Sequence, residues 1–207
     1  MLNRRIFSCS VALAALAAGM QQAQAATATV GQAAPDFTAL DALGKSHKLS
    51  DFKGKHVVLE WTNPGCPFVV KHYGGNMQAL QAEFTTKGVV WLSINSTASN
   101  ASDYLAPAQL AAWKTEKKAA STAMLMDESG KIGQLYSAKT TPHMYIISPQ
   151  GVLVYAGAID SVPSARVDDI KTATNYIRQG LNQALAGKAI VTSSTRPYGC
   201  SVKYKDA

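Results

Sequence analysis

The chain has 207 residues, of which 47% are hydrophobic and 16% are charged, and its formal net charge is +7. A length of this order suits one domain with a proper core. The lysines and arginines form no dense run with interleaved aromatic residues, so the charge favours a soluble basic surface over nucleic-acid binding.

The first 25 residues have the three-part layout of a secretory signal peptide. Arg4 and Arg5 lie in a basic start, residues 6–18 form an apolar run, and Ala23-Gln24-Ala25 ends the segment. The alternative, a membrane anchor, is disfavoured because this run is well short of the ~20 residues that a span needs. We therefore expect cleavage after Ala25, which leaves a secreted, periplasmic protein of 182 residues without Cys9 and with a formal charge of +5.

The rest of the chain alternates short apolar runs with segments of helical spacing. Several of the runs are rich in valine and isoleucine, which is typical of strands covered on both faces. Gly74-Gly75 interrupts the first long helix and is expected to kink or break it. No linker divides this body, so we expect one domain over 26–191 and a C-terminal tail over 192–207. In chain order we expect a hairpin of short strands over 37–40 and 48–50, a strand over 56–61, a helix over 68–84, a strand over 89–94, a helix from Pro107, a strand over 123–127, a short helix over 131–136, a hairpin with strands 144–148 and 152–156, and a last helix from Asp168 to Leu185.

The stretch Asn63-Pro64-Gly65-Cys66-Pro67-Phe68 places one sulfur at the start of a helix. Pro67 suits the first helical position, where its missing N–H costs nothing. The free N–H groups and the dipole of a helix N-terminus favour a thiolate over a thiol. Cys66 is therefore a candidate nucleophile.

Cys200 is the other cysteine that remains after cleavage of the first 25 residues. In an oxidising compartment, a bond between Cys66 and Cys200 would close a loop of well over a hundred residues. The chain-entropy model gives such a bond about 5 kcal/mol. The sequence leaves three possibilities open, namely a catalytic pair, a structural staple, or two unrelated thiols.

The order of these elements, with the cysteine at the top of the first long helix, resembles the thioredoxin fold. The opening Val30 to Phe37 resembles the start of secreted thioredoxins and of peroxiredoxins in the alkyl-hydroperoxide-reductase/redoxin group. Asn63 to Tyr73 and Arg196 to Tyr204 resemble the peroxiredoxin-like, thioredoxin-domain family, with its Cys-Pro-aromatic motif and its late Gly-Cys-Ser-aliphatic-Lys-aromatic tail. The resemblance covers Val30 to Tyr204. It implies an α/β thioredoxin-like fold, in which helices flank a central mixed β-sheet that has an N-terminal β-hairpin and a C-terminal tail.

Two features of those families are missing from the motif. The position three after Cys66 is Val69, so the thioredoxin Cys-x-x-Cys pair is absent. Typical peroxiredoxins carry Pro-x-x-x-Thr-x-x-Cys, and here Leu59 and Asn63 stand in place of the proline and the threonine. The motif that supports peroxidase activity in typical peroxiredoxins is therefore missing. Any resolving thiol for Cys66 must come from elsewhere in the chain.

The resemblance implies catalytic roles for four residues. Cys66 is the expected nucleophile, and Cys200, on a tail that could reach back, is the candidate resolving thiol. Pro142 matches the cis-proline that faces the active-site cysteine in this fold. Glu60, six residues before Cys66, stands where thioredoxins place a buried acid as proton acceptor. The alternative for Glu60 is a carboxylate at the rim of the site, paired with a lysine.

The resemblance also implies a substrate-binding set around Pro142. This loop would offer backbone groups to an extended substrate. The expected set is Thr141, Pro142, His143, Pro67 and Phe68.

We therefore expect a thiol-disulfide oxidoreductase or a peroxiredoxin-like antioxidant protein that needs no cofactor. Its expected partners are protein or small-molecule thiols and disulfides, with peroxides as a further class, and neither nucleic acid nor, after cleavage, a membrane. One alternative is a carrier of copper or another soft metal that uses Cys66 with His143 and His72. We prefer the interpretation that the two are ordinary surface histidines that bind no metal. The other alternative is a non-catalytic protein with a structural disulfide.

Overall fold

A computed structural model of the chain describes residues 27–205. The expected signal peptide, its cleavage point and Cys9 lie outside the described residues, as do the last two residues of the tail. Within the described part, no helix is both long enough and apolar enough to cross a membrane.

The centre of the structure is a five-stranded sheet with the strand order β5-β4-β3-β7-β8. The β3–β4 and β4–β5 pairs are parallel, whereas β3–β7 and β7–β8 are antiparallel, so the sheet is mixed, as expected. Every residue of β3 and β4 is buried, which confirms strands covered on both faces. The strands are β3 (Val57–Trp61), β4 (Val90–Asn95), β5 (Ala123–Met126), β7 (His143–Ile147) and β8 (Leu153–Gly157).

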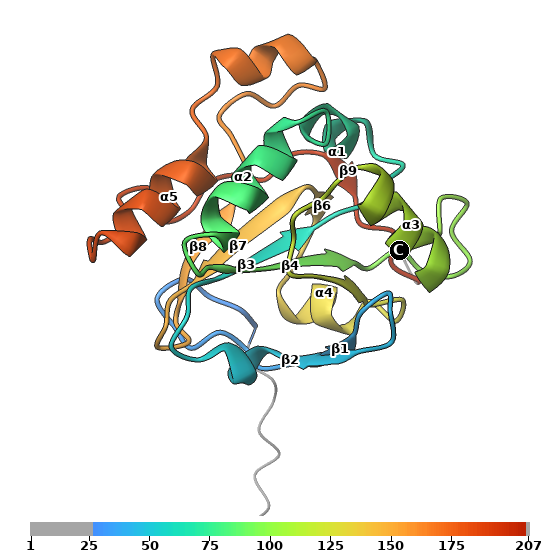
Figure 1. Ribbon diagram of the computed structural model, residues 1–207, viewed down its shortest axis with the longest axis horizontal. Coiled ribbons are helices and arrows are strands. Elements are labelled where there is room, and N and C mark those ends of the chain that lie inside the picture. Colours follow the sequence, from blue (N-terminus) through green and yellow to red (C-terminus); the bar gives the residue numbers. More distant parts are fainter. Residues whose placement is uncertain (1–26, 206–207) are drawn as a thin grey trace, which may run out of the picture.

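Helices cover the two faces of this sheet unequally, as Figure 1 shows. One face packs against α1, α2 and α5 through an apolar cluster that includes Cys66. The other face packs against α4 and the N-terminal hairpin of β1 and β2. The expected order of elements is therefore confirmed. The remaining elements are β1 (Thr38–Leu40), β2 (Ser46–Lys48), α1 (Pro67–His72), α2 (Asn76–Thr85), α3 (Pro107–Glu116), α4 (Lys131–Leu135), α5 (Tyr176–Leu185), and the 3-10 helices η1 (Leu49–Phe52) and η2 (Val167–Lys171).

The helix expected after Cys66 is broken where the two glycines stand. Helix α1 ends at His72 and α2 begins at Asn76. Gly75 between them has φ +127°, a backbone conformation that other residues rarely adopt. The break separates the segment that carries Cys66 from the longer helix that packs on β4.

The last helix begins later than the sequence suggested, so the expectation of one helix from Asp168 was wrong. Asp168 and Asp169 lie in the 3-10 helix η2, and α5 begins only at Tyr176. Asn175 caps α5, because its side-chain oxygen accepts the backbone N–H of Arg178 at 2.8 Å. This local cap fixes the helix start.

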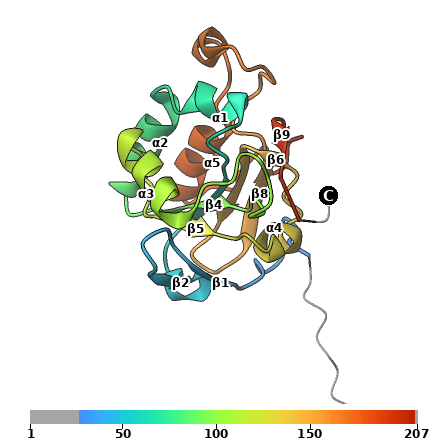
Figure 2. The same cartoon turned by 90° about the vertical axis from the view of Figure 1, so that its right-hand side faces the viewer.

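The C-terminal tail returns to the body of the domain. Its strand β9 (Cys200–Ser201) pairs antiparallel with β6 (Thr140–Thr141), immediately before Pro142. Figure 2 shows this pair beside α1. The tail therefore lies against the segment expected to face Cys66.

Candidate active site

Cys66 is the N-cap residue of α1, and Pro67 occupies the first turn, as the Cys-Pro sequence predicts. The turn that leads into it is held by Asn63. The Asn63 side-chain oxygen accepts the N–H of Gly65 at 2.8 Å, and its side-chain nitrogen donates to Asp103 at 2.8 Å. The turn connects the end of β3 to the start of α1. Cys66 at its end is buried, with only 2% of its surface exposed.

The loop before β7 closes the other side of Cys66. The Thr141–Pro142 peptide bond is cis, as expected. The Sγ of Cys66 lies 3.0 Å from the carbonyl oxygen of Thr141, to which the thiol form donates. Cys66, Thr141 and Pro142 are therefore brought together by segments that are distant in the sequence.

Cys200 joins this group through the β6–β9 pairing. Its register partner is Thr141, the same residue that contacts Cys66. Both cysteines are free thiols, and Cys200 packs against the apolar cluster that contains Cys66. The tail thus places a second sulfur against the first without any Cys-x-x-Cys motif.

The two thiols have pKa values moved in opposite directions. Burial raises the pKa of Cys66, but interactions with Cys200, Thr141 and backbone groups outweigh burial, so the pKa falls below its ordinary value. Burial, the hydrogen bond to Cys66 and the negative charge of Cys66 together raise the pKa of Cys200 to about 12. These two directions favour loss of the proton from Cys66 before loss of the proton from Cys200.

Glu60 lies beneath the site and is fully buried, so the alternative of a rim carboxylate paired with a lysine was wrong. Burial raises the pKa of this carboxyl, while four hydrogen bonds oppose the rise. Its donors belong to α1's C-cap, α2 and β4, and no hydrogen bond joins it to Cys66 among the described residues. The four donors are Tyr73 Oη at 2.7 Å, Trp91 Nε1 at 2.7 Å, Gln81 Nε2 at 3.0 Å and Ser93 Oγ at 3.0 Å.

The two histidines of the metal alternative do not meet at the sulfur. His143 is the register partner of Trp61, and Trp61 packs in the apolar cluster on the opposite face of the sheet from Cys66. His72 is fully buried and accepts from Asn76 instead. Both are therefore buried rather than surface histidines, and His143 does not lie on the same face of the sheet as the sulfur. Within residues 27–205, no three His, Cys, Asp or Glu side chains are grouped so that they could hold a metal ion.

Pro67 and Phe68 lie on the outer side of the site. Pro67 is exposed, whereas the ring of Phe68 packs edge-on against Tyr198 of the tail, with the ring centroids 5.8 Å apart. Sequence reasoning did not assign roles to Tyr198, Asn63 or Asp103. Tyr198 stands inside the tail motif that was quoted, so a signal existed for it, whereas Asp103 lies in a loop without any pattern.

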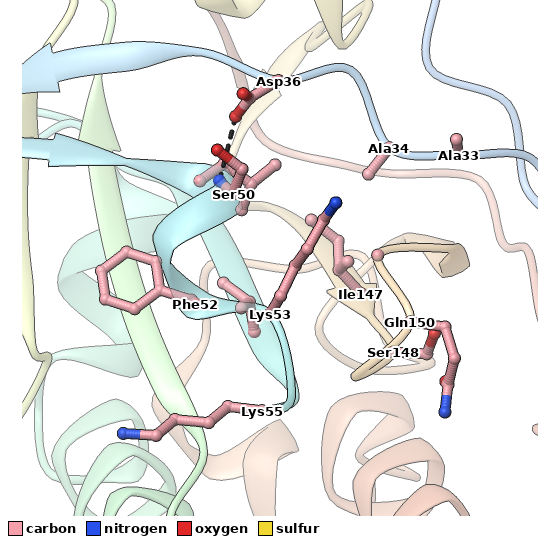
Figure 3. Close-up of a pocket in the computed structure, with 13 residues that line it drawn as sticks. Ala33, Ala34, Asp36, Ser50, Phe52, Lys53, Lys55, Ile147, Ser148 and Gln150 are labelled. Atoms are coloured by element: carbon pink, nitrogen blue, oxygen red, sulfur yellow. Dashed lines mark hydrogen bonds between the residues drawn. The ribbon is translucent and has the colours of Figure 1, made fainter.

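Two hollows lie away from the sulfurs. The pocket in Figure 3 is lined by residues such as Lys53 and Ser148, and it is at the opposite end of β3 from Cys66, since Val57 at the strand's start contributes to it. A cavity of about 580 Å³ lies beside the tail, with Asp160, Tyr198 and Gly199 in its wall. Neither wall includes a cysteine.

Comparison with known proteins supports this description of the chain. The model of the AhpC/TSA family matches residues 30–156, a segment that includes Cys66 and Pro142 but not Cys200. Among curated proteins, none matches the chain.

Similar solved structures share the fold. A hypothetical protein from Sinorhizobium meliloti 1021 has a TM-score of 0.77 at 24% identity, with 87% of this chain and 97% of that chain covered. An uncharacterized conserved protein from Geobacillus kaustophilus has a TM-score of 0.73 at 24% identity, with 86% and 94% covered. The thioredoxin domain of a thiol-disulfide oxidoreductase from Bacteroides vulgatus has a TM-score of 0.51 at 21% identity, with 70% and 98% covered. Together they establish a thioredoxin-like α/β fold.

Proposed function

The chain belongs to the AhpC/TSA family and is a thiol-dependent oxidoreductase, and we propose that it exchanges disulfides with Cys66 as the attacking sulfur and Cys200 as the resolving sulfur. The observation that carries this proposal is that both sulfurs meet at Thr141, which pairs with Cys200 across β6 and β9 and whose carbonyl oxygen lies 3.0 Å from Cys66 Sγ. The pKa values of the two thiols are moved in opposite directions. A thiol with a lowered pKa forms the attacking thiolate more readily, while a neighbouring thiol with a raised pKa keeps its proton until the second step.

The first step joins Cys66 to the substrate. The Cys66 thiolate attacks one sulfur of a substrate disulfide, a new S–S bond forms, the substrate S–S bond breaks, and one half leaves as a thiolate. This step consumes the negative charge on Cys66, which is one cause of the raised pKa of Cys200. The pKa of Cys200 therefore falls at the moment when its sulfur is needed.

The second step releases the substrate. Cys200 gives its proton to the departed thiolate, and its sulfur attacks the sulfur of Cys66, so that the second half of the substrate leaves as a thiolate. The substrate has then gained two electrons, as one thiol and one thiolate that takes a proton from water, and the chain has lost two as a Cys66–Cys200 disulfide. An external dithiol must reduce this disulfide before another turn.

Peroxide reduction is a second candidate, and membership of the AhpC/TSA family is the observation that favours it. The Cys66 thiolate would attack one peroxide oxygen to give a sulfenic acid and an alcohol or water, and Cys200 would then displace water to form the same disulfide. The Asn63 side chain, which replaces the threonine of typical peroxiredoxins, is taken up by Gly65 and Asp103. For this reason we place disulfide exchange first.

The other assigned residues are proposed to act around this pair. Thr141 and Pro142 form the wall against which the substrate sulfur must fit, with Pro67 and Phe68 at its outer rim. Glu60 is proposed as the group that relays the proton of Cys200 to the departed thiolate, a role supported by its raised pKa. His143 contributes to the fold of the loop, since its Nδ1 lies 3.0 Å from the Tyr145 hydroxyl. We propose protein or small-molecule thiols and disulfides as the partners.

We propose that the chain works in the periplasm as a secreted protein, with one domain over 26–191 and a tail over 192–207. The basic start, apolar run and small residues of the first 25 positions support this. N-terminal sequencing of the protein recovered from the periplasmic fraction is expected to begin at Ala26. A chain recovered only from the cytoplasm with Met1 in place would refute secretion.

Trapping the intermediates tests the cycle. The reduced protein is mixed with a small disulfide, quenched with acid, and mapped by peptide mass spectrometry. The wild type is expected to form the Cys66–Cys200 bond, Cys200→Ser to stop with one half of the reagent on Cys66, and Cys66→Ser to form neither. In the uncleaved chain, which keeps Cys9, Cys9→Ser is the matched control and is expected to behave as the wild type.

Two other results would favour different functions. If Cys200→Ser accumulates sulfenic acid with hydrogen peroxide much faster than it forms the mixed disulfide, peroxide reduction takes first place. If the Cys66–Cys200 bond forms only during folding, and its reduction destabilises the chain by several kcal/mol without any turnover, the disulfide is a structural staple.

A further inference from the structure

A cluster of buried ionisable groups lies on the flank of α1, and the redox steps do not use it. Lys71 and His72 follow Cys66 on α1, and the side chains of both have no exposed surface. Both point to the carboxylate of Asp160, in the segment after β8. Lys71 Nζ and His72 Nε2 lie 3.6 Å and 3.7 Å from Asp160 Oδ2. A lysine without exposed surface is costly unless it is paired, so the position of Asp160 is strongly determined.

The tail supplies the remaining partner of this cluster. The hydroxyl of Tyr198 donates to Asp160 Oδ1, and it also lies 3.3 Å from His72 Nε2. The Lys71 ammonium lies 5.7 Å from the centre of the Tyr198 ring. Tyr198 stands two residues before Cys200, so the cluster ties down the part of the tail that carries the second sulfur.

Tyr198 is therefore held on several sides by groups of the helix that Cys66 begins. Cys200 is also held by the two-residue pairing of β9 with β6 and, further along the tail, by hydrogen bonds from the Val202 N–H to the Lys139 carbonyl and from the Tyr204 hydroxyl to the Ala138 carbonyl. The contacts of Tyr198 are the ones that tie the tail to α1. A resolving sulfur works only when it is held in line with the bond that it attacks, and a misplacement of about 1 Å can cost about 100-fold in rate.

We propose that Tyr198, Asp160 and Lys71 form a latch that holds the Cys200 tail on helix α1 and thereby sets the rate at which Cys200 resolves Cys66. This inference rests on the proposed function, because it assigns positioning residues to its second step. Within residues 27–205, no hydrogen bond joins any of the three to either sulfur. The latch acts on the approach of Cys200 and leaves the attack by Cys66 alone.

The test separates the two steps in single turnovers. Reduced protein in a Cys9→Ser background is mixed with excess dithiodipyridine, a small disulfide that releases a coloured thiopyridone when a thiol attacks it. The attack by Cys66 releases the first thiopyridone, and resolution by Cys200 releases the second. Cys200→Ser identifies the first release. Each variant is measured at a pH where its first release has reached its plateau, so that the thiolate fraction is the same throughout.

Tyr198→Phe removes only the hydroxyl and keeps the ring on Phe68. We expect the first release to be unchanged and the second to slow by about 10- to 100-fold, the factor that corresponds to one hydrogen bond to a charged group. Tyr176→Phe is the matched control, because Tyr176 lines the same cavity and is expected to leave both releases unchanged. Thermal unfolding of each reduced variant verifies that it is folded.

Three results would count against the latch, and they can be told apart. If Tyr198→Phe releases the second thiopyridone as fast as the wild type, or if Tyr176→Phe slows it equally, the latch is refuted while the two-cysteine cycle stands. If the wild type itself gives no second release and no Cys66–Cys200 bond, the proposed function fails first.

Asp160→Asn provides a second variant, which keeps the shape of the side chain but removes its charge, and it is expected to slow the second release in the same way.

Discussion

Gly199→Ala is expected to slow the resolution of Cys66 without affecting its attack on a disulfide. Gly199 has φ +140°, and a Cβ built there would lie 2.0 Å from the carbonyl oxygen of Thr141 and 3.2 Å from the nitrogen of Pro142. Both atoms belong to the backbone beside Cys66, so they cannot turn away as a flexible side chain could. The tail must therefore move back from β6.

The size of the effect follows from this geometry. Carbon atoms in good contact stay about 3.5 Å or more from their neighbours, so the tail has to shift by about 1 Å or more, which can cost about 100-fold in the rate of a positioned step. A left-handed or otherwise unusual backbone at a non-glycine residue costs a further 1–3 kcal/mol, roughly. We therefore expect the second thiopyridone release to slow by about 100-fold and the first, at its plateau pH, to remain as in the wild type.

Gly187→Ala is the matched control for this substitution. Gly187 also has a positive φ, +70°, but nothing lies within 4 Å of a Cβ built there, and it follows helix α5 instead of approaching the site. It measures the backbone strain without the clash. Resolution at the wild-type rate in Gly199→Ala, or equal slowing in Gly187→Ala, would refute the reasoning.

Three further predictions concern ionisable groups. The pKa of Cys66 is lowered, so its alkylation by iodoacetamide should reach half its plateau rate at a pH below the usual thiol pKa of about 8.5. Cys200→Ala should move this midpoint to higher pH. An unmoved midpoint would show that Cys200 does not stabilise the thiolate. Burial lowers the pKa of His72 to about 4. Between pH 6.5 and pH 4, this residue is therefore protonated in the unfolded chain but neutral in the folded chain. Denaturant unfolding should show stability that is complete above pH 6.5 and falls by about 3 kcal/mol down to pH 4, with less loss in His72→Gln. Glu60→Gln turns an acceptor of four hydrogen bonds into a group with two donors, and thermal unfolding should show a loss of about 1–3 kcal/mol; a pH profile of resolution equal to that of the wild type would remove Glu60 as a proton acceptor.

Local sequence determined most of the fold. The apolar runs at 56–61 and 89–94 became the buried strands β3 and β4, because strands covered on both faces need continuous apolar side chains. The Cys-Pro pair placed Cys66 at the start of α1, since proline is suited to the first turn. The late start of α5 was missed, because the aspartates at 168 and 169 also suit a helix N-terminus.

The assembly of the site was decided by the tertiary structure. The alternation of side chains along a strand shows which residues share a face of the sheet. It does not show which of the two faces carries Cys66. His143 pairs with Trp61 and lies on the other face from Cys66. The sequence alone named Cys200 as a candidate partner, because it is the other cysteine outside the expected signal peptide. Its contact with Cys66 needs the β6–β9 pairing and the buried group around Asp160. Those contacts join segments that lie far apart along the chain, and no local pattern encodes such a distance.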